Sequence, residues 1–365
     1  MATVGRQLLA SDWALDQPLA RRMVESWINA DRLPHAILLC GPTGVGKRKF
    51  AIWLASILMC QHESILPCRE CPSCQKVDRL SHSDLKLLLP SLATNSNRPN
   101  DSLSEFDRLQ AYIDGQLYDH SVIKAREVRK LRNEMVYTPH ENGRKVAVLF
   151  DSELMQPAAS NSLLKILEEP VQGRVFILVT SFPERLLPTV LSRCHRLVLR
   201  PLNKLGLQNK LKSLNVDGER LELSVRLGQG SISNAQGILN GELDEIRKVV
   251  EDFIESGLLH REDTFWDVIE KVGKKKGKNQ QLKFLELCAY YLRDLFLIQN
   301  EKTDLIAMVD RKSFLNSLVS YWKEEQIENG IRALDGAVES LQRNVSFELV
   351  IVDFWRLLRH LGSPR

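Results

Sequence analysis

The sequence predicts an α/β fold built on a parallel sheet, followed by helical domains, and three observations lead to this prediction. Residues 1 to about 200 alternate short apolar runs with helical patterns, as expected of a doubly wound sheet. A glycine-rich phosphate loop lies between the first such run and the next helical pattern. Beyond Pro201 the strand signals stop, and long helical patterns dominate from Asp244 onward.

The five predicted strands are apolar runs of the kind found in strands that helices cover on both faces. They are residues 36–40, 84–89, 145–150, 175–180 and 196–200. Helical patterns follow at 47–60 and 155–169, and two or three short helices are expected between 207 and 239. The C-terminal helices are predicted at 244–259, 264–272, 281–300, 312–324, 326–343 and 347–361. In the third of these, one apolar face is formed by Leu282, Leu285, Cys288, Leu292, Leu295 and Phe296.

Length and composition indicate a soluble protein of two or three domains. The chain has 365 residues, of which 44% are hydrophobic and 26% charged, with a net charge of +4. No apolar run approaches the roughly 20 residues that span a bilayer, and the first residues lack the layout of a signal peptide. We therefore expect a cytoplasmic protein with an α/β domain at 1–200, a small helical lid at 201–243 and an all-helical domain at 244–365.

The phosphate loop is a G-x4-GK match that follows a predicted strand and opens a predicted helix. Its backbone N–H groups would attract phosphate oxygens, and its lysine would reach the β- and γ-phosphates. The candidate nucleotide-binding residues are Gly41, Thr43, Gly44, Gly46 and Lys47. Arg48, however, stands where a Ser or Thr hydroxyl normally helps to hold Mg²⁺. Two interpretations stay open, namely ATP or ADP binding and a relic loop that serves only as a turn.

The acidic residues after the third predicted strand also depart from those of a working ATPase. Asp151 ends this strand, where an acidic residue normally belongs to the Mg²⁺ shell. The next residue is Ser152 rather than a glutamate, and Glu153 comes one position late. A carboxylate displaced by one position points elsewhere, so activation of a water molecule is not expected. The alternative for Asp151 is a helix cap.

Four of the seven cysteines form the pattern C-x7-C-x2-C-x2-C. In a reducing cytoplasm a tight cluster indicates metal ligands rather than disulfides, and thiolates bind Zn²⁺ tetrahedrally. The candidate ligands of a structural zinc module at about 60–74 are Cys60, Cys68, Cys71 and Cys74. The alternatives are buried thiols without metal, or a site in which His62 or His82 replaces one cysteine.

Three further motifs each have a plain structural interpretation beside a functional one. The tripeptide Ser192-Arg193-Cys194 precedes the last predicted strand, and an exposed arginine is usually only solvated. Leu163, Ile166 and Leu167 share one helix face, which indicates core packing ended by Pro170. The lysines around Gly277 form a basic run that is either a solvated loop or a contact with DNA phosphates.

Together these residues resemble the delta-prime family of bacterial DNA polymerase III clamp-loader subunits, within the AAA+ superfamily. The resemblance is close over about residues 10–200 and looser but collinear beyond. Its motifs are His35 to Leu39, the four cysteines, His82-Ser83-Asp84, Asn161 to Lys165 with Glu168-Glu169-Pro170, Pro183 to Leu187, Ser192-Arg193-Cys194, and Asn344 with Glu348-Leu349.

The resemblance implies a stator, a subunit that does not hydrolyse ATP but offers Arg193 as an arginine finger to the ATP site of a neighbouring motor subunit. It further implies a zinc module, a collar domain, and a five-subunit ring with gamma/tau and delta subunits. This ring places the sliding clamp on primed DNA at the bacterial replisome, as part of a DNA polymerase holoenzyme.

Two alternatives belong to other classes of protein. A motor subunit of the same ring would carry Ser or Thr at 48, Glu at 152 and arginine at 233, where this chain has Arg48, Ser152 and Ser233. A zinc-dependent nucleic-acid-binding module would need basic and aromatic residues around the cysteines, where the chain has Glu63, Glu70 and an Ile-Leu pair. The stator interpretation is therefore preferred.

Overall fold

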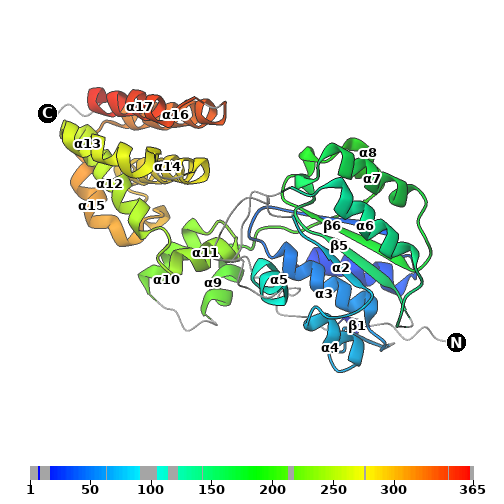
Figure 1. Ribbon diagram of the computed structural model, residues 1–365. Helices are drawn as coiled ribbons and strands as arrows, with labels where there is room; N and C mark the ends of the chain where they lie inside the picture. Colours follow the sequence, from blue (N-terminus) through cyan, green and yellow to red (C-terminus); the bar gives the residue numbers. More distant parts are fainter. Residues whose placement is uncertain are drawn as a thin grey trace. The chain divides into compact units, whose positions relative to one another are not determined.

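The computed structural model describes residues 7–8, 17–62, 64–90, 105–113, 122–141, 143–212, 218–274, 277–343 and 345–361 (Figure 1). Residues 91–104, a polar stretch whose composition predicts a surface loop, lie outside these residues, as do Lys275, Lys276 and Asn344, so the predictions for them stay open. The chain divides into two compact units, one of Met1–Leu207 with Gly230–Ser233 and one of Gln208–Gln229 with Asn234–Arg365. The division into three domains expected from the sequence remains a prediction.

The first unit is built on a five-stranded parallel sheet, as the sequence predicts. The strands lie in the order β4–β5–β6–β2–β7. Strand β2, which precedes the phosphate loop, pairs with β6 through Ala36 opposite Phe176 and with β7 through Ile37 opposite His195. The bounds are β2 Ala36–Cys40, β4 Leu85–Leu88, β5 Lys145–Leu149, β6 Arg174–Thr180 and β7 His195–Val198. Because all five run in parallel, the loops after β2, β5 and β6 meet at one edge of the sheet.

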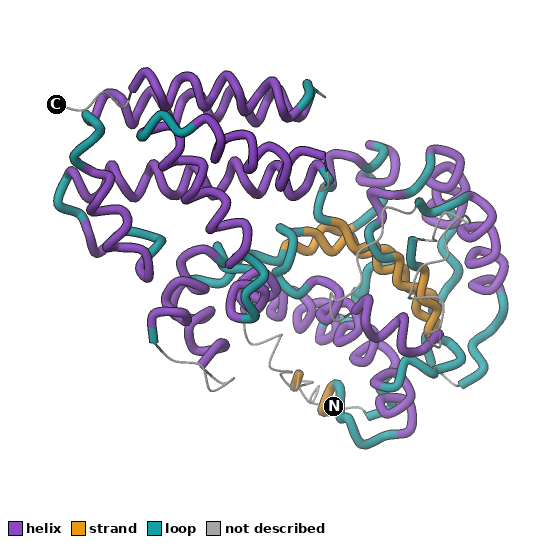
Figure 2. Tube along the Cα trace, turned by 60° about the vertical axis from the view of Figure 1, so that its left-hand side comes forward, coloured by secondary structure: helices purple, strands orange, loops and turns teal. Residues whose placement is uncertain are grey.

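Helices cover both faces of this sheet (Figures 1 and 2). They bury its apolar side chains in two separate clusters. This arrangement explains why the strands are continuous apolar runs without alternation. One face carries α2 Pro18–Asn29, α3 Lys47–Met59, α4 Pro72–Asp78 and α5 Glu105–Ile113. The other carries α6 Ala125–Val136, α7 Pro157–Glu168 and α8 Pro188–Leu191. The predicted doubly wound α/β fold is confirmed.

Several helices of this unit were not predicted individually. Helix α6 is rich in charge, and its inward face is marked only by Val128, Leu131 and Met135. Helix α4 spans seven residues inside the cysteine module, too few for a periodic pattern. A two-residue strand pair, β1 Gln7–Leu8 with β3 Ile65–Leu66, is likewise below the length that a pattern reveals.

The second unit is helical throughout its described residues, and helix α14 Lys278–Gln299 contributes the most residues to its core. Leu285, Cys288, Leu292 and Leu295 are fully buried there, while Leu282 and Phe296 are partly buried, which confirms the predicted face. The other helices are α10 Glu219–Leu227, α11 Ile232–Leu239 (its first two residues in the first unit), α12 Asp244–Leu258, α13 Glu262–Ile269, α15 Lys312–Val319, α16 Glu324–Gln342 and α17 Phe347–Leu361. Helix α9 Lys204–Lys212 spans the boundary between the units.

Two predicted helix ends in this unit are wrong. Helix α15 ends at Val319 instead of continuing to residue 324, because the chain turns there and buries Trp322 in the core. After Ile269 the chain continues as a π-helix, Glu270–Lys274, in place of an α-helix. Within the part of the chain that the structure describes, no helix has both the length and the apolar character needed to cross a membrane.

The first residue of β6 holds the end of a neighbouring helix. Arg174 is buried, and its guanidinium donates to the carbonyl oxygens of Met135 at 3.1 Å, Tyr137 at 2.9 Å and Gln172 at 2.8 Å. Met135 lies in the last turn of α6, whose final carbonyls have no partner within the helix. One side chain therefore fixes the end of α6 and the following loop to the sheet.

We expect Arg174→Ala to lower the free energy of unfolding by about 2–4 kcal/mol, because three carbonyls lose a buried donor. Arg174→Lys is expected to recover little, because an ammonium lacks the planar fork that reaches all three oxygens. Urea denaturation measures both effects. Arg129→Ala, at an exposed position of α6, is the control and should change stability by less than about 0.5 kcal/mol. A loss for Arg174→Ala as small as that of the control would contradict this assignment.

Candidate functional site

The phosphate loop links β2 to α3 at the carboxyl edge of the sheet, as predicted. Gly44 and Gly46 have φ angles of 78° and 89°, a left-handed conformation that glycine adopts readily. Lys47 is buried, and its Nζ donates to the carbonyl oxygens of Gly41 at 2.8 Å and Pro42 at 2.7 Å. The ammonium thus folds back onto its own loop, and a bound phosphate would have to replace these two carbonyls as its partner.

The charge of Lys47 is set by opposing influences. Burial lowers the pKa of its ammonium to about 8, while the carboxylates of Glu153 and Asp151 act in the opposite direction. The lysine is therefore still mostly protonated at neutral pH. It keeps the positive charge that a phosphate group requires.

Arg48 binds the carboxylate that would otherwise face a magnesium ion. Its guanidinium lies 2.8 Å from Asp151 Oδ2 and donates to the backbone oxygen of Tyr112 at 2.7 Å. It also lies 3.9 Å from the centre of the Tyr112 ring, and the Tyr112 hydroxyl donates to the same Asp151 oxygen. Burial and the adjacent Asp151 raise the pKa of Tyr112, so the phenol stays neutral. A protein cation therefore occupies the place beside Asp151 where Mg²⁺ is held in P-loop NTPases.

The carboxyl groups after β5 differ in part from what the sequence indicated. Asp151 makes no cap hydrogen bond to the following 3₁₀ turn, so the helix-cap alternative is wrong. Ser152 is buried, and its hydroxyl donates to the Leu149 carbonyl at 2.9 Å. Glu153 accepts a hydrogen bond from the Ser181 N–H at 3.2 Å, just after β6. Glu153 is thus fixed against the sheet, and its negative charge raises the pKa of Lys47.

The Gly230–Ser233 segment lies directly on the phosphate loop. A Cβ atom added at Gly44 would lie 2.0 Å from the Ser231 hydroxyl oxygen, so only glycine allows this approach. The Ser233 N–H points to the Gly44 carbonyl at 3.5 Å. Position 233, where a motor subunit would carry arginine, thus lies next to the loop but offers no cationic side chain.

Arg193 lies at the surface between α8 and β7. Its guanidinium pairs with Glu168 at 2.9 Å and donates to the Thr189 carbonyl at 3.0 Å. The two side chains of this pair are 35% and 49% exposed. Such an exposed pair stabilises a protein by only about 0–1 kcal/mol, so Arg193 is available to another partner at small cost.

Glu168 follows the face of α7 that the sequence assigned to the core. Leu163, Ile166 and Leu167 are buried, which confirms core packing as the role of this motif. The core packing fixes α7 and thereby places Glu168, at its C-terminal end, beside Arg193.

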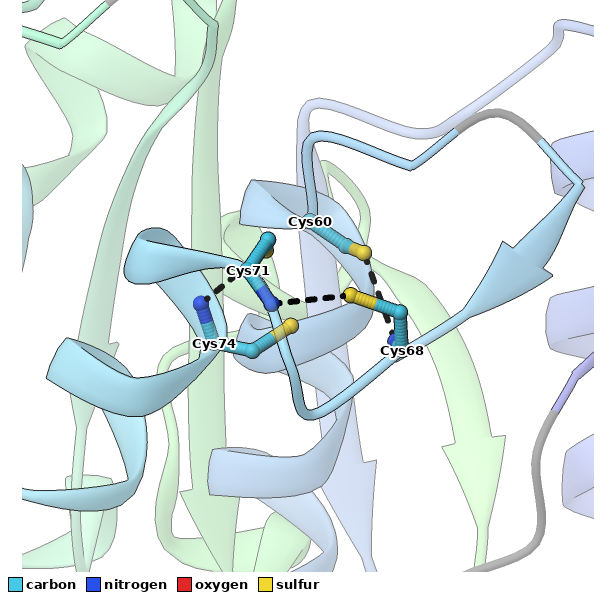
Figure 3. A group of neighbouring side chains, drawn as sticks. All are labelled: Cys60, Cys68, Cys71 and Cys74. Carbon is cyan, nitrogen blue, oxygen red and sulfur yellow. Dashed lines mark hydrogen bonds between the residues drawn. The ribbon is translucent and has the colours of Figure 1, made fainter.

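The four predicted metal-ligating cysteines lie together beyond the other end of α3 (Figure 3). Their sulfur atoms all lie within 4.8 Å of one another. Cys60 follows the last residue of α3, Cys68 lies in the loop, and Cys71 caps the N-terminus of α4 with Cys74 one turn later. A tetrahedral zinc site with Zn–S bonds of about 2.3 Å would bring the sulfurs to about 3.8 Å, so only a small contraction is needed.

Backbone N–H groups already point at these sulfur atoms. Cys60 Sγ accepts from the Cys68 N–H at 3.4 Å, Cys68 Sγ from the Cys71 N–H at 3.3 Å, and Cys71 Sγ from the Cys74 N–H at 3.4 Å. Although burial raises the pKa of Cys71, the amide donors of Gln61 and Cys74 outweigh it and lower the pKa to about 7. Burial raises the pKa of Cys60 and Cys74, and a metal ion would have to displace their protons.

A buried hydroxyl gives an independent sign that the cluster suits a metal. Ser56, one turn before Cys60, has a buried oxygen with no hydrogen-bond partner among the described residues. It lies beside Cys74 and lowers the pKa of that thiol. An O–H group of this kind stabilises a thiolate, and metal-bound cysteines are thiolates. The cluster therefore fits a metal ion such as zinc.

Among the described residues, the group that could hold a metal ion consists of the four cysteines and includes neither of the two histidines considered as substitute ligands. His82 binds the Ser73 hydroxyl through Nε2 at 2.9 Å. His62 contributes its backbone N–H to Cys60. The four thiols complete a tetrahedral set without either ring, so these alternatives lose their support.

Tyr112, Ser231 and Glu168 are contacts of the predicted site residues that the sequence did not reveal. Tyr112 lies on a helix with no motif, and Ser231 lies within the predicted lid at 201–243 without any pattern that indicates a contact with the phosphate loop. Glu168 stood in a recognised motif, but nothing in its spacing indicated Arg193 as its partner.

Comparison with known proteins agrees with this architecture. Residues 16–203, just over half of the chain, match the family model described as "DNA polymerase III, delta subunit". DNA polymerase III subunit delta' of Bacillus subtilis is 26% identical over 91% of this chain and 93% of its own length. The same subunit of Pseudomonas aeruginosa is 37% identical over 44% of this chain and 41% of its own length.

Other subunits of DNA polymerase III are also similar to this chain. DNA polymerase III subunit tau of Bacillus subtilis is 25% identical over 73% of this chain and 46% of its own length. The family match over the α/β unit and the nearly full-length similarity to a delta' subunit agree with each other. The chain therefore belongs to the DNA polymerase III delta-subunit family, in its delta-prime branch.

Proposed function

We propose that this chain is a stator of the replicative clamp loader, a subunit that does not hydrolyse ATP and completes the ATP site of a neighbour. The observation that carries this proposal is the pairing of Arg48 with Asp151 at 2.8 Å. Phosphoryl transfer requires a metal ion to neutralise charge between the β- and γ-phosphates. A guanidinium has no lone pair with which to bind Mg²⁺, and its positive charge repels the ion. Its hydrogen bonds to Asp151 and Tyr112 keep it in this place.

Two further positions weaken the case for a motor subunit. Ser152 turns its hydroxyl inward to the Leu149 carbonyl, so no base stands ready to activate water. Ser233 lies beside the loop but has no cationic group to offer a phosphate. The alternative, an ATP-hydrolysing motor of the same loader, would need the metal ligand, the base and the lid arginine together. Nucleotide binding without hydrolysis is compatible with the loop formed by Gly41, Thr43, Gly44, Gly46 and Lys47.

Arg193 is the residue proposed to act in the neighbouring site. It lies on the surface, its charge is offset by a single exposed carboxylate, and the pair separates at little cost. A guanidinium presented to the γ-phosphate of ATP stabilises the charge of the transition state and accelerates hydrolysis by about 10³-fold or more. The catalytic role of Arg193 is thus in trans.

The proposed assembly is a five-subunit ring of this chain with gamma/tau and delta subunits. Helices α12 to α17, within 244–365, would form the collar that joins the subunits, and 201–243 the lid. Similarity to gamma and tau subunits supports a shared architecture. A shared architecture suits assembly into one ring, because neighbouring members need matching collar surfaces. The ring would load the sliding clamp onto primed DNA in the bacterial cytoplasm.

The metal proposed for the cysteine cluster is zinc in a structural role. Four thiolates leave no open coordination position for a substrate or water. Bound zinc would supply cross-links between the end of α3, the loop with Cys68 and the start of α4. Without the ion, these elements are joined by weak N–H···S bonds, by local packing and by the hydrogen bond from the Ser73 hydroxyl to the Met59 carbonyl.

Arg48→Thr should make the response to nucleotide depend on magnesium. In the wild type, the change in Tm caused by ADP is expected to be the same with Mg²⁺ as with EDTA, because Arg48 occupies Asp151. In Arg48→Thr the hydroxyl and the freed carboxylate provide two magnesium ligands, so ADP should raise Tm more when Mg²⁺ is present. Lys49→Thr leaves the pair intact and is the control. A wild-type shift that appears only with Mg²⁺ would contradict the proposal.

Arg193→Ala should abolish the contribution of this chain to ATP turnover by the reconstituted loader. With clamp and primed DNA present, turnover at the adjoining site is expected to fall by about 10³-fold, and clamp loading to fall with it. Glu168→Gln frees the guanidinium and should preserve turnover. Arg129→Ala, at an exposed position of α6, should also preserve it. The chain alone should be inactive. Turnover by the isolated chain, or equal turnover with Arg193→Ala, would refute the stator proposal.

Replacing Cys68 and Cys71 with serine should release the metal. Serine oxygens are poor zinc ligands, so the purified double variant is expected to hold almost no zinc, compared with one ion per chain in the wild type. Inductively coupled plasma mass spectrometry measures the zinc content. The α/β unit should also become more sensitive to protease around residues 60–80. Cys288→Ser, far in sequence and buried in the helical unit, is the matched control. Absence of zinc from the wild type would refute the metal assignment.

A further inference from the structure

A buried serine joins the two halves of the cysteine cluster. Ser73 lies on α4 between Cys71 and Cys74, and its hydroxyl donates to the Met59 carbonyl at 2.7 Å. Met59 is the last residue of α3, immediately before Cys60. Apart from the sulfur contacts, this bond ties the helix that carries two cysteines to the helix that ends at another. Ser73 is only 1% exposed, so water does not compete for the bond.

The orientation of Ser73 is in turn fixed by His82. The Asp84 N–H donates to His82 Nδ1 at 3.1 Å, so Nδ1 acts as an acceptor and the ring proton of the neutral imidazole lies on Nε2. Nε2 then donates to the Ser73 oxygen at 2.9 Å, which leaves the serine proton for the Met59 carbonyl. Burial lowers the pKa of His82, which favours this neutral form.

His82 is anchored to the sheet through its neighbours. Asp84, which precedes β4, is fully buried and accepts from the backbone N–H groups of His140 at 2.9 Å and Glu141 at 2.8 Å. The Lys145 ammonium at the start of β5 lies 3.9 Å from the same carboxylate. The hydrogen-bond chain therefore runs from the sheet through His82 and Ser73 to the residue before Cys60.

We infer that Ser73 and His82 are positioning residues for the metal, which hold Cys60 at the correct separation from Cys71 and Cys74. This inference rests on the proposed zinc site, and it concerns how firmly the ion is held, since neither side chain is a ligand. Without the Ser73 bond, the end of α3 and the start of α4 are held less firmly, and one thiolate would leave the ion more often. Outer-shell partners of this kind typically change metal affinity by about 10- to 100-fold.

The test measures the rate at which the full-length chain transfers zinc to a chromogenic chelator. Ser73→Ala and His82→Gln are expected to release zinc about 10- to 100-fold faster than the wild type. Zinc content at saturation should stay at one ion per chain, and the absorption spectrum of the cobalt-substituted protein should still indicate four thiolates. Ser81→Ala and His140→Gln are the matched controls, because both side chains are exposed.

Arg174→Ala tests whether a lower stability of the α/β unit is by itself enough to speed the release of zinc. This variant weakens the same α/β unit without contacting the cysteine module, so its zinc should leave at the wild-type rate. Equal release rates for Ser73→Ala and the wild type, or equally fast release from Arg174→Ala, would overturn the inference. If the wild type itself binds no zinc, the proposed metal site fails instead, which is a distinct outcome.

Discussion

Burial of helix α3 is the constraint on which the rest of the α/β unit depends. Ten of its thirteen residues are buried against the sheet and the neighbouring helices. Such a helix is about 20 Å long, and its two ends support different chemistry. Lys47 and Arg48 begin the helix beside the phosphate loop, and Cys60 follows its last turn and belongs to the cysteine cluster. The position of both sites is thus set by one packed element, and neither site can move far without disturbing the core.

The Arg48–Asp151 pair satisfies the carboxylate beside the phosphate loop from within the protein. Asp151 follows β5 and would be an uncompensated charge without a cation beside it. A magnesium ion meets that need in an ATPase only while nucleotide is bound, whereas Arg48 meets it permanently. A half-buried carboxylate with a fixed guanidinium and a tyrosine hydroxyl is satisfied, so the loop and sheet remain in place. Arg48 therefore both stands where a magnesium ligand is normally found and satisfies the carboxylate beside the loop.

The sequence predicted the sheet, the long helices and the four cysteines because each leaves a regular mark. Strands such as residues 36–40 are continuous apolar runs, and the face of α14 repeats every three or four residues. The cysteine spacing predicted a cluster that the structure confirms. In contrast, Tyr112 reaches Asp151 from a helix after a long polar stretch, and no local pattern records such a contact. The Ser73–His82 bond likewise depends on how α4 is placed against the end of α3, which only tertiary packing determines.

Arg48 and Arg193 are chemically identical side chains, but they differ in how easily each can leave its present partners, because their surroundings differ. Arg48 has 16% of its side chain exposed and binds a carboxylate, a carbonyl and an aromatic ring, so removing it from this position would leave several groups unsatisfied. The Arg193 side chain is 35% exposed, and its partners are the half-exposed carboxylate of Glu168 and the Thr189 carbonyl. Water can replace that carboxylate at small cost, and so can a phosphate of greater charge. Arg48 is therefore held firmly in its own site, while the more exposed Arg193 can exchange its partner, as the proposed stator role requires.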